Sequence, residues 1–472
     1  MKRLIWVMAA SAGVLLVPAA QQHDITGTIV NTQRPALAVP NFRGDGQAQS
    51  FMAAFNDTLW SDLDGAGIFK MVPKTMYPTA IPQQPSDFRV PPPPVVEMPR
   101  SRKKQEPAQP QSGGGLWMSD WSNPPAQANY LVMGYTAVQN GLFVLRGWLI
   151  DLSRPSVANA QVLGKTYIES LDEAGARKAA HEFASDILSQ FGSKSLFGTH
   201  IYFVRELGRA GPNPIKEIWV MDPDGKNQKQ ITHFNSLTIQ PAVSPDGTKI
   251  AFTSYVRGNP GIFVFSVDPV RDLRFYNQRG ASVTATPSFT PDGRQIVFAS
   301  SAGTGHCCRI FIANLDGSNM RPISSTGAID VEPKINPKTG MDMAFVSGRS
   351  GPQQIYKMNM DGADMERLSD GTGEVSNPAW HPDGQLLAYS WTRGFMEGAW
   401  NVFVMDVATR QYNQLTHGEG RNENPSWAPD GKHIVFMSTR HGSKQIWSML
   451  ANGDQLQQLT AQGSNETPVW GK

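Results

Sequence analysis

Hydrophobic and polar positions recur with a regular period over the C-terminal half of the chain. A proline opens each unit, an apolar residue stands two places after it, and a Pro-Asp-Gly turn follows in most units. A β-branched and aromatic segment such as Ile250-Ala-Phe comes next, and a second apolar segment such as Ile262-Phe-Val-Phe follows. The opening prolines are Pro241, Pro287, Pro333, Pro378, Pro425 and Pro468. Spacing in the forties with short strands in each unit is typical of propeller blades.

Each unit is predicted to form four strands, and the incomplete units at the two ends complement each other. Ile201-Tyr-Phe-Val and Ile218-Trp-Val-Met supply a second and a third strand without an inner strand. Thr467-Pro-Val-Trp470 is an inner strand without a blade. Joining the two fragments gives a sixth blade and removes free sheet edges. We therefore predict that residues 199–472 form an all-β six-bladed β-propeller, in which the C-terminal strand closes the first blade.

The N-terminal half shows helical and strand patterns in alternation. Apolar residues four places apart predict an amphipathic helix within 48–69, and a second helix is predicted over 172–191. Strands are predicted at 36–42 and in three segments near 130–135, 143–151 and 162–168. The segment 21–35 is compatible with either an edge strand or a mobile tail. Residues 20–195 are therefore expected to form an α/β N-terminal domain with a mixed sheet.

The composition changes abruptly between about residues 77 and 125. Four consecutive prolines at 91–94, a basic run at 100–104 and three glycines at 113–115 show no apolar periodicity. Such composition favours an exposed and largely disordered insertion. Trp117 and Trp121 are expected to pack where the chain re-enters the domain.

The first residues have the features of an export signal. Lys2 and Arg3 precede a 14-residue apolar run from Leu4 to Val17, and small residues follow. This pattern predicts a signal peptide at residues 1–19 and an exported, soluble protein without stable membrane insertion. The alternative is an uncleaved anchor, for which the run is short. The formal net charge of +2 gives no long-range field that would attract nucleic acid.

The sequence contains no recognisable catalytic motif. A Gly-x-Ser-x-Gly elbow and a phosphate-binding Gly-Lys-Ser/Thr loop are both missing, and the nine histidines are scattered singly. We therefore predict no catalytic residues, no cofactor and no metal site. The two cysteines, Cys307 and Cys308, are adjacent. They are compatible with a vicinal disulfide or with two free thiols.

One face of the predicted propeller is richer in polar side chains than the other. The loops that lead into the inner strands share a rim with the loops between second and third strands. These two sets carry carboxylates, amides and cations, whereas the opposite face consists mostly of short Pro-Asp-Gly and Asp-Gly turns. The pattern favours a protein-docking surface, although loops are also polar simply because water surrounds them. Candidate docking residues here include Asn377, Asn424 and Glu466.

The whole arrangement resembles the TolB family of the Tol–Pal cell-envelope system. The resemblance rests on the leader, the small α/β domain and the six Pro-Asp-Gly blades that end at Pro468-Val-Trp. Arg34-Pro-Ala-Leu-Ala-Val-Pro40 and Asp64-Gly-Ala-Gly-Ile-Phe-Lys are also similar to family segments. The resemblance implies a non-enzymatic periplasmic protein that maintains outer-membrane integrity and acts in constriction during cell division.

The resemblance also implies two partners, the lipoprotein Pal and the inner-membrane-anchored protein TolA. The family binds Pal at the propeller mouth, and its contacting Thr-Glu pair corresponds to Val331 and Glu332 here. Its contacting histidine corresponds to Val283, which Thr286 follows three places later. The family binds TolA through the mature N-terminal segment, which is residues 21–33 here, and Pal binding biases TolA recruitment. The residues expected in this tail contact are Asp24, Ile25, Thr28, Ile29 and Val30.

Two other functions remain open at the level of sequence. One is a secreted propeller enzyme, similar to a lactonase or a lyase, that uses the central channel and needs ligands clustered there. The other is a module that binds sugar or cell wall directly. The docking adaptor is the preferred hypothesis. We expect it to be a monomer on its own, with other outer-membrane or peptidoglycan-associated proteins as further partners.

Overall fold

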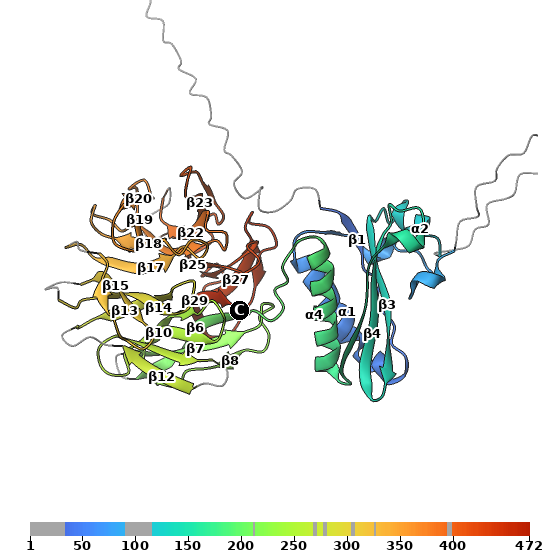
Figure 1. Cartoon of the computed structure of the whole chain (residues 1–472), viewed down its shortest axis with the longest axis horizontal. Helices are drawn as coiled ribbons and strands as arrows, with labels where there is room; N and C mark the ends of the chain where they lie inside the picture. The colour runs from blue at the N-terminus through green and yellow to red at the C-terminus, as the bar shows by residue number, and fades with distance from the viewer. Residues whose placement is uncertain are drawn as a thin grey trace, which may run out of the picture.

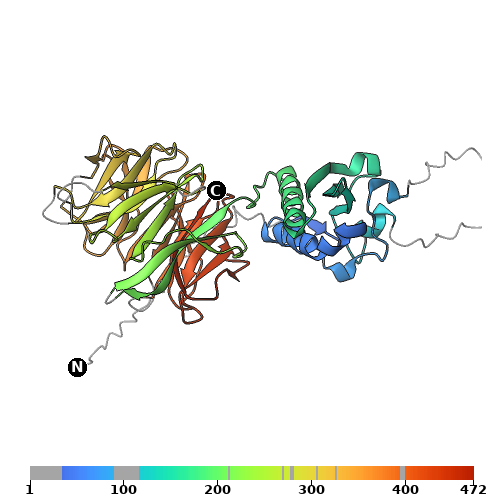
Figure 2. The same cartoon turned by 90° about the horizontal axis from the view of Figure 1, so that it is seen from below.

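The computed structural model describes residues 34–89, 116–210, 213–267, 271–276, 281–303, 307–324, 327–393 and 399–472. Within these residues the chain forms a small α/β domain followed by a six-bladed β-propeller, which lie side by side (Figures 1 and 2). The predicted fold class is therefore confirmed. The predicted signal peptide and the 21–33 tail lie outside the described residues. No helix in the described ranges has both the length and the apolar character needed to cross a membrane.

The N-terminal domain is built on a five-stranded mixed sheet in the order β2-β1-β3-β4-β5. β1 pairs in parallel with β2 and β3, whereas β3, β4 and β5 form antiparallel pairs. The bounds are Ala36–Ala38 for β1, Lys70–Met71 for β2, Tyr130–Gln139 for β3, Leu142–Asp151 for β4 and Gln161–Ser170 for β5. The strand predicted at 36–42 ends early because the N–H of Val39 binds the hydroxyl of Tyr77, and Pro40 has no N–H.

Two helices cover the face of this sheet that is turned toward the propeller (Figure 1). They are α1, Met52–Gly65, which continues from the 3-10 helix η1, Gly46–Phe51, and α4, Glu173–Gln190. Asp172 caps α4 by accepting a 2.7 Å hydrogen bond from Gly175 N. Phe55, Leu59 and Leu63 of α1 and Phe183 of α4 are fully buried in one core. Both predicted helices are thus confirmed, and each buries its apolar stripe.

The opposite face of the sheet is covered in part by residues that the sequence assigned to the insertion. This layer contains η2, Lys74–Met76; η3, Pro85–Asp87; α2, Met118–Ser122; and α3, Val157–Ala160. Trp121 is fully buried, Phe88 is 4% exposed, and both belong to a second core. The ring of Tyr77 lies 5.4 Å from that of Trp121. The insertion predicted at 77–125 is therefore too wide, because residues 77–89 and 116–125 pack on the sheet without a regular apolar period.

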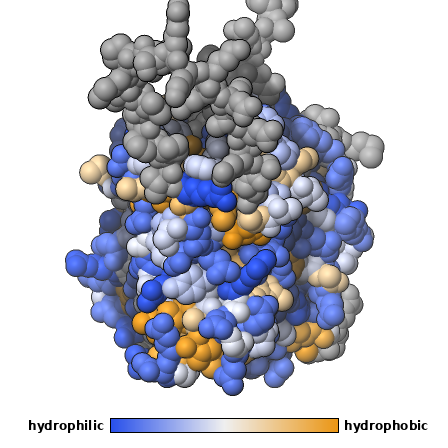
Figure 3. Space-filling view, turned by 90° about the vertical axis from the view of Figure 1, so that its right-hand side faces the viewer, coloured by the Kyte–Doolittle hydropathy of each residue, from blue (hydrophilic) through white to orange (hydrophobic). Residues whose placement is uncertain are grey.

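Seen from the side of the N-terminal domain, hydrophobic side chains form small groups between hydrophilic ones (Figure 3). The most exposed large hydrophobic residue among those described in this domain is Ile168, at 58%. It lies on the edge strand β5, on which the charged Lys165 is also exposed. Charges beside an exposed edge strand disfavour pairing with another chain.

Each complete blade has four antiparallel strands, and the first strand of each blade lies innermost. Five blades follow the order of the sequence, as β9–β12, β13–β16, β17–β20, β21–β24 and β25–β28. The inner strands are β9, Thr238–Val243; β13, Thr284–Phe289; β17, Asp330–Ile335; β21, Val375–Trp380; and β25, Asn422–Trp427. The second strands are β10, Lys249–Ser254; β14, Gln295–Ser300; β18, Asp342–Ser347; β22, Leu386–Trp391; and β26, His433–Ser438.

The outermost strand of each blade is more exposed than the other three. The third strands are β11, Gly261–Ser266; β15, Arg309–Asn314; β19, Gln354–Asn359; β23, Asn401–Asp406; and β27, Gln445–Leu450. The outer strands are β12, Arg271–Tyr276; β16, Arg321–Pro322; β20, Glu366–Arg367; β24, Tyr412–Gln414; and β28, Gln457–Gln458. Apolar side chains of neighbouring blades pack together in shared clusters, so each blade is held by the next.

The sixth blade joins the two ends of the propeller, as predicted. The C-terminal strand β29, Ser464–Gly471, pairs antiparallel with β6, His200–Ala210, which pairs in turn with β7, Asn213–Met221. The outer strand is β8, Lys229–Gln230. The indole Nε1 of Trp470 donates a 2.9 Å hydrogen bond to the Thr199 hydroxyl. Trp470 is 7% exposed, so the last strand contributes both apolar burial and hydrogen bonds to closure.

The two ends of the central channel are chemically different and are named here for their loops. The loop rim is the end where the inner strands begin and where second strands connect to third strands. The turn rim is the opposite end, which carries the Pro-Asp-Gly turns. The N-terminal domain contacts the turn rim of the β25–β28 blade, where His433 Nε2 lies 2.7 Å from the carbonyl oxygen of Gly65. Lys432 Nζ also donates a 2.7 Å hydrogen bond to Ser193 Oγ.

Candidate functional site

A residue in the left-handed region precedes the opening proline of every blade. These six residues, named the waist of the channel, are Gln240, Thr286, Glu332, Asn377, Asn424 and Thr467, with φ values of 56°, 52°, 54°, 56°, 58° and 45°. The pairing of each inner strand with its second strand shifts register at the same place. A bulge of this kind re-aims a side chain. Positive φ is unfavourable for β-branched residues, so Thr286 and Thr467 are held there by their surroundings.

Hydrogen bonds link the waist residues from blade to blade. Gln240 Oε1 accepts from Thr286 N at 3.3 Å, and Thr286 Oγ1 accepts from Glu332 N at 3.2 Å. Glu332 Oε2 accepts from Asn377 N at 2.7 Å. The side chain of one blade thus satisfies the backbone N–H that the bulge exposes in the next blade. These bonds connect neighbouring blades, which are separate sheets.

At the next junction a serine links the two waist residues, and the series of waist hydrogen bonds ends there. Ser390 Oγ donates to Asn377 Oδ1 and accepts from Asn424 N, both at 3.1 Å. Within the described residues, no bond between waist residues crosses the two junctions beside Thr467, although Trp470 N donates a 3.0 Å hydrogen bond to Ser426 Oγ across one of them. The Thr467 hydroxyl is buried without a hydrogen-bond partner. These two junctions flank the closing strand β29. The waist is therefore bonded where the chain is continuous and open where the ring closes.

Charged pairs hold the closing strand at the junctions that the waist hydrogen bonds do not cross. The carboxylate of Glu466 on β29 accepts from the ammonium groups of Lys216 on β7 and Lys444 in the β26–β27 loop. The side chains of Glu466 and Lys216 are each 14% exposed. Burial alone would raise the pKa of Glu466, but the hydrogen bonds and charges of the two lysines outweigh it and lower the pKa. Glu466 is thus ionised and paired within the propeller.

The channel contains a cavity of about 430 Å³ between the waist and the prolines of the turn rim. Its walls come from all six inner strands and include prolines and the tryptophans Trp380, Trp427 and Trp470. Its described lining contains one glutamate, Glu332, and the lysines Lys334 and Lys472. Burial raises the pKa of Glu332, against the hydrogen bonds from Asn377 and the positive charge of Lys334. A cavity of this size and mixed character is in the range of small-molecule sites.

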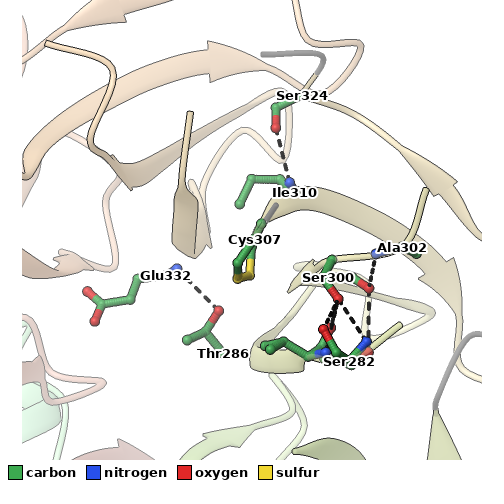
Figure 4. The surroundings of a disulfide bond; sticks show 12 residues. Ser282, Thr286, Ser300, Ala302, Cys307, Ile310, Ser324 and Glu332 are labelled. Atoms are coloured by element: carbon green, nitrogen blue, oxygen red, sulfur yellow. Dashed lines mark hydrogen bonds between the residues drawn. A yellow bond between two sulfur atoms is a disulfide. The ribbon is translucent and has the colours of Figure 1, made fainter. Parts of the chain in front are cut away.

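The adjacent cysteines lie at the loop rim, beside the waist. Cys307 and Cys308 form a vicinal disulfide, in agreement with the first of the two readings of the sequence. Asp330 N donates a 2.9 Å hydrogen bond to the Cys308 carbonyl oxygen, which ties this segment to the start of β17. Figure 4 shows the disulfide next to the hydrogen bond between Thr286 and Glu332. The disulfide therefore lies beside two of the predicted docking residues, Thr286 and Glu332 of the waist.

Comparison with known proteins places this architecture in a family. The chain matches the family description "TolB beta propeller domain" over residues 190–389 and 369–472. Residues 190–472 are 283 of the 472 residues, so the match covers more than half of the chain. The chain belongs to the TolB beta-propeller family.

Relatives and a solved structure agree with this assignment. The chain is 34% identical over 200 residues to "Protein TolB homolog" of Chlorobium luteolum, an alignment of 42% of this chain and 43% of the relative. It is 30% identical over 240 residues to "Tol-Pal system protein TolB" of Bordetella pertussis, 50% of this chain and 51% of the relative. The chain thus aligns with about half the length of these curated relatives. The crystal structure of TolB from Acinetobacter baumannii has the same fold, with a TM-score of 0.70, 21% identity, and coverage of 93% and 96% of the two chains.

The predicted Pal-contact residues lie close together in the fold but are engaged in different ways. Glu332, Asn377, Asn424 and Thr286 are waist residues, and Glu466 is in the ion pairs of the closing strand. Val283 and Val331 are on the loop rim and partly buried. The structure therefore brings all seven to one end of the channel. Five of them also take part in bonds that hold blades together.

The cations that the sequence assigned to a docking surface bind their own blades. Arg349 donates a 2.9 Å hydrogen bond to the fully buried Asp330, and its guanidinium lies 4.7 Å from the ring centre of Tyr356. Arg440 bonds Asn422 at 3.1 Å and lies 4.6 Å from the ring centre of Trp447. Arginines that are stacked and paired in this way stabilise their own loop, and their guanidinium groups are already engaged within the blade.

Sequence reasoning missed two groups of candidate residues. Val256 and Ile329 on the loop rim are 40% and 53% exposed, although both are apolar. Lys334 lines the channel one place after a repeat proline. Aligning the repeats by their prolines would have found Lys334, because the other blades have small or apolar residues there. Within the described ranges, no three His, Cys, Asp or Glu residues are grouped so that they could hold a metal ion.

Proposed function

We propose that this protein is a non-enzymatic periplasmic adaptor of the Tol–Pal system. It binds Pal at the loop rim of the propeller and TolA through residues 21–33, and so supports outer-membrane integrity and constriction during division. Membership of the TolB beta-propeller family supports the proposal, as does the name "Tol-Pal system protein TolB" of a relative aligned over half of the chain. The tail residues lie outside the described part of the chain.

The difference between the two ends of the propeller is the observation that carries the Pal contact. The turn rim of the last blade is in contact with the N-terminal domain through His433 and Lys432. The loop rim has no such contact among the described residues, and it exposes Val256 and Ile329 beside polar loops. Apolar side chains surrounded by a polar rim are typical of protein-binding surfaces. The loop rim is thus the free end at which a partner can dock.

The choice of variants follows from the contacts of each residue. Arginine at Glu332 or Glu466 would remove bonds that hold blades together, so a loss of Pal binding would be confounded with a loss of folding. Val256→Asp and Ile329→Asp place a charge on exposed side chains instead. Met341→Asp is the matched control, because Met341 is 74% exposed and lies near the turn rim.

The Pal experiment measures the affinity of purified Pal for the full chain and these variants. We expect the double variant Val256→Asp, Ile329→Asp to weaken Pal binding about tenfold or more, because the two introduced carboxylates would lose their hydration when Pal covers them. Met341→Asp should bind as the unmodified protein does, and all variants should unfold alike. Equal affinity of the double variant and the unmodified protein would refute docking at this rim.

The TolA contact is tested by deletion of residues 21–33. We expect this deletion to abolish capture of TolA and to leave Pal binding unchanged. Deletion of residues 101–113 removes the same number of residues from a segment that is also outside the described part of the chain, and it should affect neither partner. Retention of TolA by the chain that lacks residues 21–33 would exclude the tail from the contact.

A further inference from the structure

The cavity in the channel has an asymmetry that the repeat does not explain. One place after the repeat proline, five blades have a small or apolar residue, namely Ala242, Ser288, Ala379, Ser426 and Val469. The sixth has Lys334. All six residues line the cavity. Five other blades show that closure of the ring does not require a lysine at this position, so its presence calls for another reason.

The ammonium group of Lys334 has no bonded partner among the described residues. No hydrogen bond or ion pair reaches its Nζ, although its backbone carbonyl accepts a 2.9 Å bond from Trp380 Nε1. The nearest carboxylate in the lining, that of Glu332, accepts instead from the backbone and the side chain of Asn377. Burial lowers the pKa of Lys334, and the charge of Glu332 opposes this shift. Lys334 is partly buried, and an ammonium group withdrawn from water without a partner is costly, so a bound anion would relieve that cost.

The rest of the cavity favours a ligand with an apolar body. The walls beside Lys334 are formed by proline rings and by Phe289, Trp380 and Trp427. The volume of about 430 Å³ is far larger than an inorganic anion needs. Aromatic and proline surfaces pack against flat apolar groups, whereas an ammonium group in the lining selects the charged end of a ligand.

We propose that the channel is a binding site for a small organic anion, with an apolar or aromatic body against the inner-strand walls and a carboxylate or sulfonate bound by Lys334. The site lies on the turn-rim side of the waist, because its lining in this blade begins at Glu332 on β17 and runs to Pro337 in the turn that follows. It is therefore separate from the exposed loop-rim residues to which Pal docking is assigned. The proposal does not depend on the adaptor function.

The test uses two fluorescent probes that differ in charge. 1-Anilinonaphthalene-8-sulfonate carries an aromatic body and a sulfonate, whereas N-phenyl-1-naphthylamine has a similar body and no charge. The first variant is Lys334→Ser, which installs the residue present at this position in two other blades, Ser288 and Ser426. The matched control is Lys338→Ser, an exposed lysine of the same blade near the turn rim.

The expected result is a difference between the probes as well as between the variants. The sulfonate should bind the full chain at one site, and Lys334→Ser should weaken it about ten- to hundredfold, the value of one charge-assisted contact. Lys338→Ser should leave its affinity unchanged, and the uncharged probe should bind both variants equally. Sulfonate binding that survives Lys334→Ser, or no sulfonate binding to the unmodified chain, would overturn the proposal. Unchanged thermal unfolding of Lys334→Ser would confirm that the variant is folded.

Discussion

The waist of the channel and the loop rim above it carry different residue types for different purposes. At the waist, Glu332 and Asn377 bond to each other across a blade junction. At the loop rim, Val256 and Ile329 are exposed on loops that connect strands. The first set is polar and internal and holds the blades together, whereas the second is apolar and exposed at the surface.

This contrast shows how a repeat can hide structural residues within a functional face. The residue before each repeat proline lies in the left-handed region, so its backbone N–H is turned away from the ladder of its own blade. A buried N–H without an acceptor is unfavourable. The polar side chain of the neighbouring blade supplies that acceptor, as Glu332 does for Asn377. Polarity at this position therefore follows from the bulge and does not by itself indicate a partner.

The largest effect is expected at the closing strand, which secures the ring on which both regions depend. Trp470→Ala should lower the free energy of unfolding by about 3–5 kcal/mol, because it removes a buried indole and its bond to Thr199. Urea unfolding followed by circular dichroism measures this. Met341→Ala, at a residue that is 74% exposed, should change stability little. Similar stability of both variants would mean that β29 does not hold the ring closed.

Removal of the charge on Glu466 should have the next largest effect. Glu466→Gln leaves Lys216 and Lys444 without their carboxylate, and we expect a loss of about 2 kcal/mol in the free energy of unfolding at neutral pH. Pal affinity should stay unchanged if the variant remains folded, because Glu466 is occupied by the two lysines. A large loss of Pal affinity without a loss of stability would return Glu466 to the docking surface.

The same pair gives a pH dependence with a definite sign. Despite its burial, the two lysines lower the pKa of Glu466 in the folded protein, so ionised Glu466 stabilises the fold above the pKa of the unfolded chain. This stabilisation is lost as the pH falls through the folded-state value. The difference in unfolding free energy between the unmodified protein and Glu466→Gln should therefore shrink from pH 7 to about pH 3. A constant difference over this range would contradict the assignment.

A smaller effect is expected at the waist, where shape and charge can be separated. Glu332→Ala leaves Asn377 N without its acceptor and should cost about 1 kcal/mol of unfolding free energy. Glu332→Gln keeps an oxygen acceptor, and burial already raises the pKa of Glu332, so this variant should match the unmodified stability within about 0.5 kcal/mol. Equal losses for both variants, measured by urea unfolding, would show that the charge itself is needed.

The smallest effect on stability is expected at the loop rim. Ile329→Asp should change the unfolding free energy by no more than about 0.5 kcal/mol, since Ile329 is 53% exposed. Its effect should appear in Pal affinity alone. A variant that loses stability as well would show that Ile329 packs within the propeller, and the contrast between waist and rim would then fail at this residue.

The sequence predicted the large-scale architecture because each part of it repeats or has a clear period. The prolines from Pro241 to Pro468 mark the inner strands, and the fragments at 201–221 and 467–470 require each other to complete a blade. The helices α1 and α4 carry apolar residues at helical spacing, and the structure buries those residues. By contrast, Phe88 and Trp121 have no regular spacing, so their role in a second core could not be derived from pattern.

The sequence by itself determined six blades, their closure by the last strand and the sheet-and-helix character of the first domain. These follow from local periodicity, which the chain carries in every segment. Only the tertiary structure decided which polar residues are free. Arg349 and Glu466 were indistinguishable from docking residues until their partners, which are 19 and 22 to 250 positions away, were brought beside them. Lys334 was set apart in the same way, since its lack of a partner depends on what the other five blades place around it.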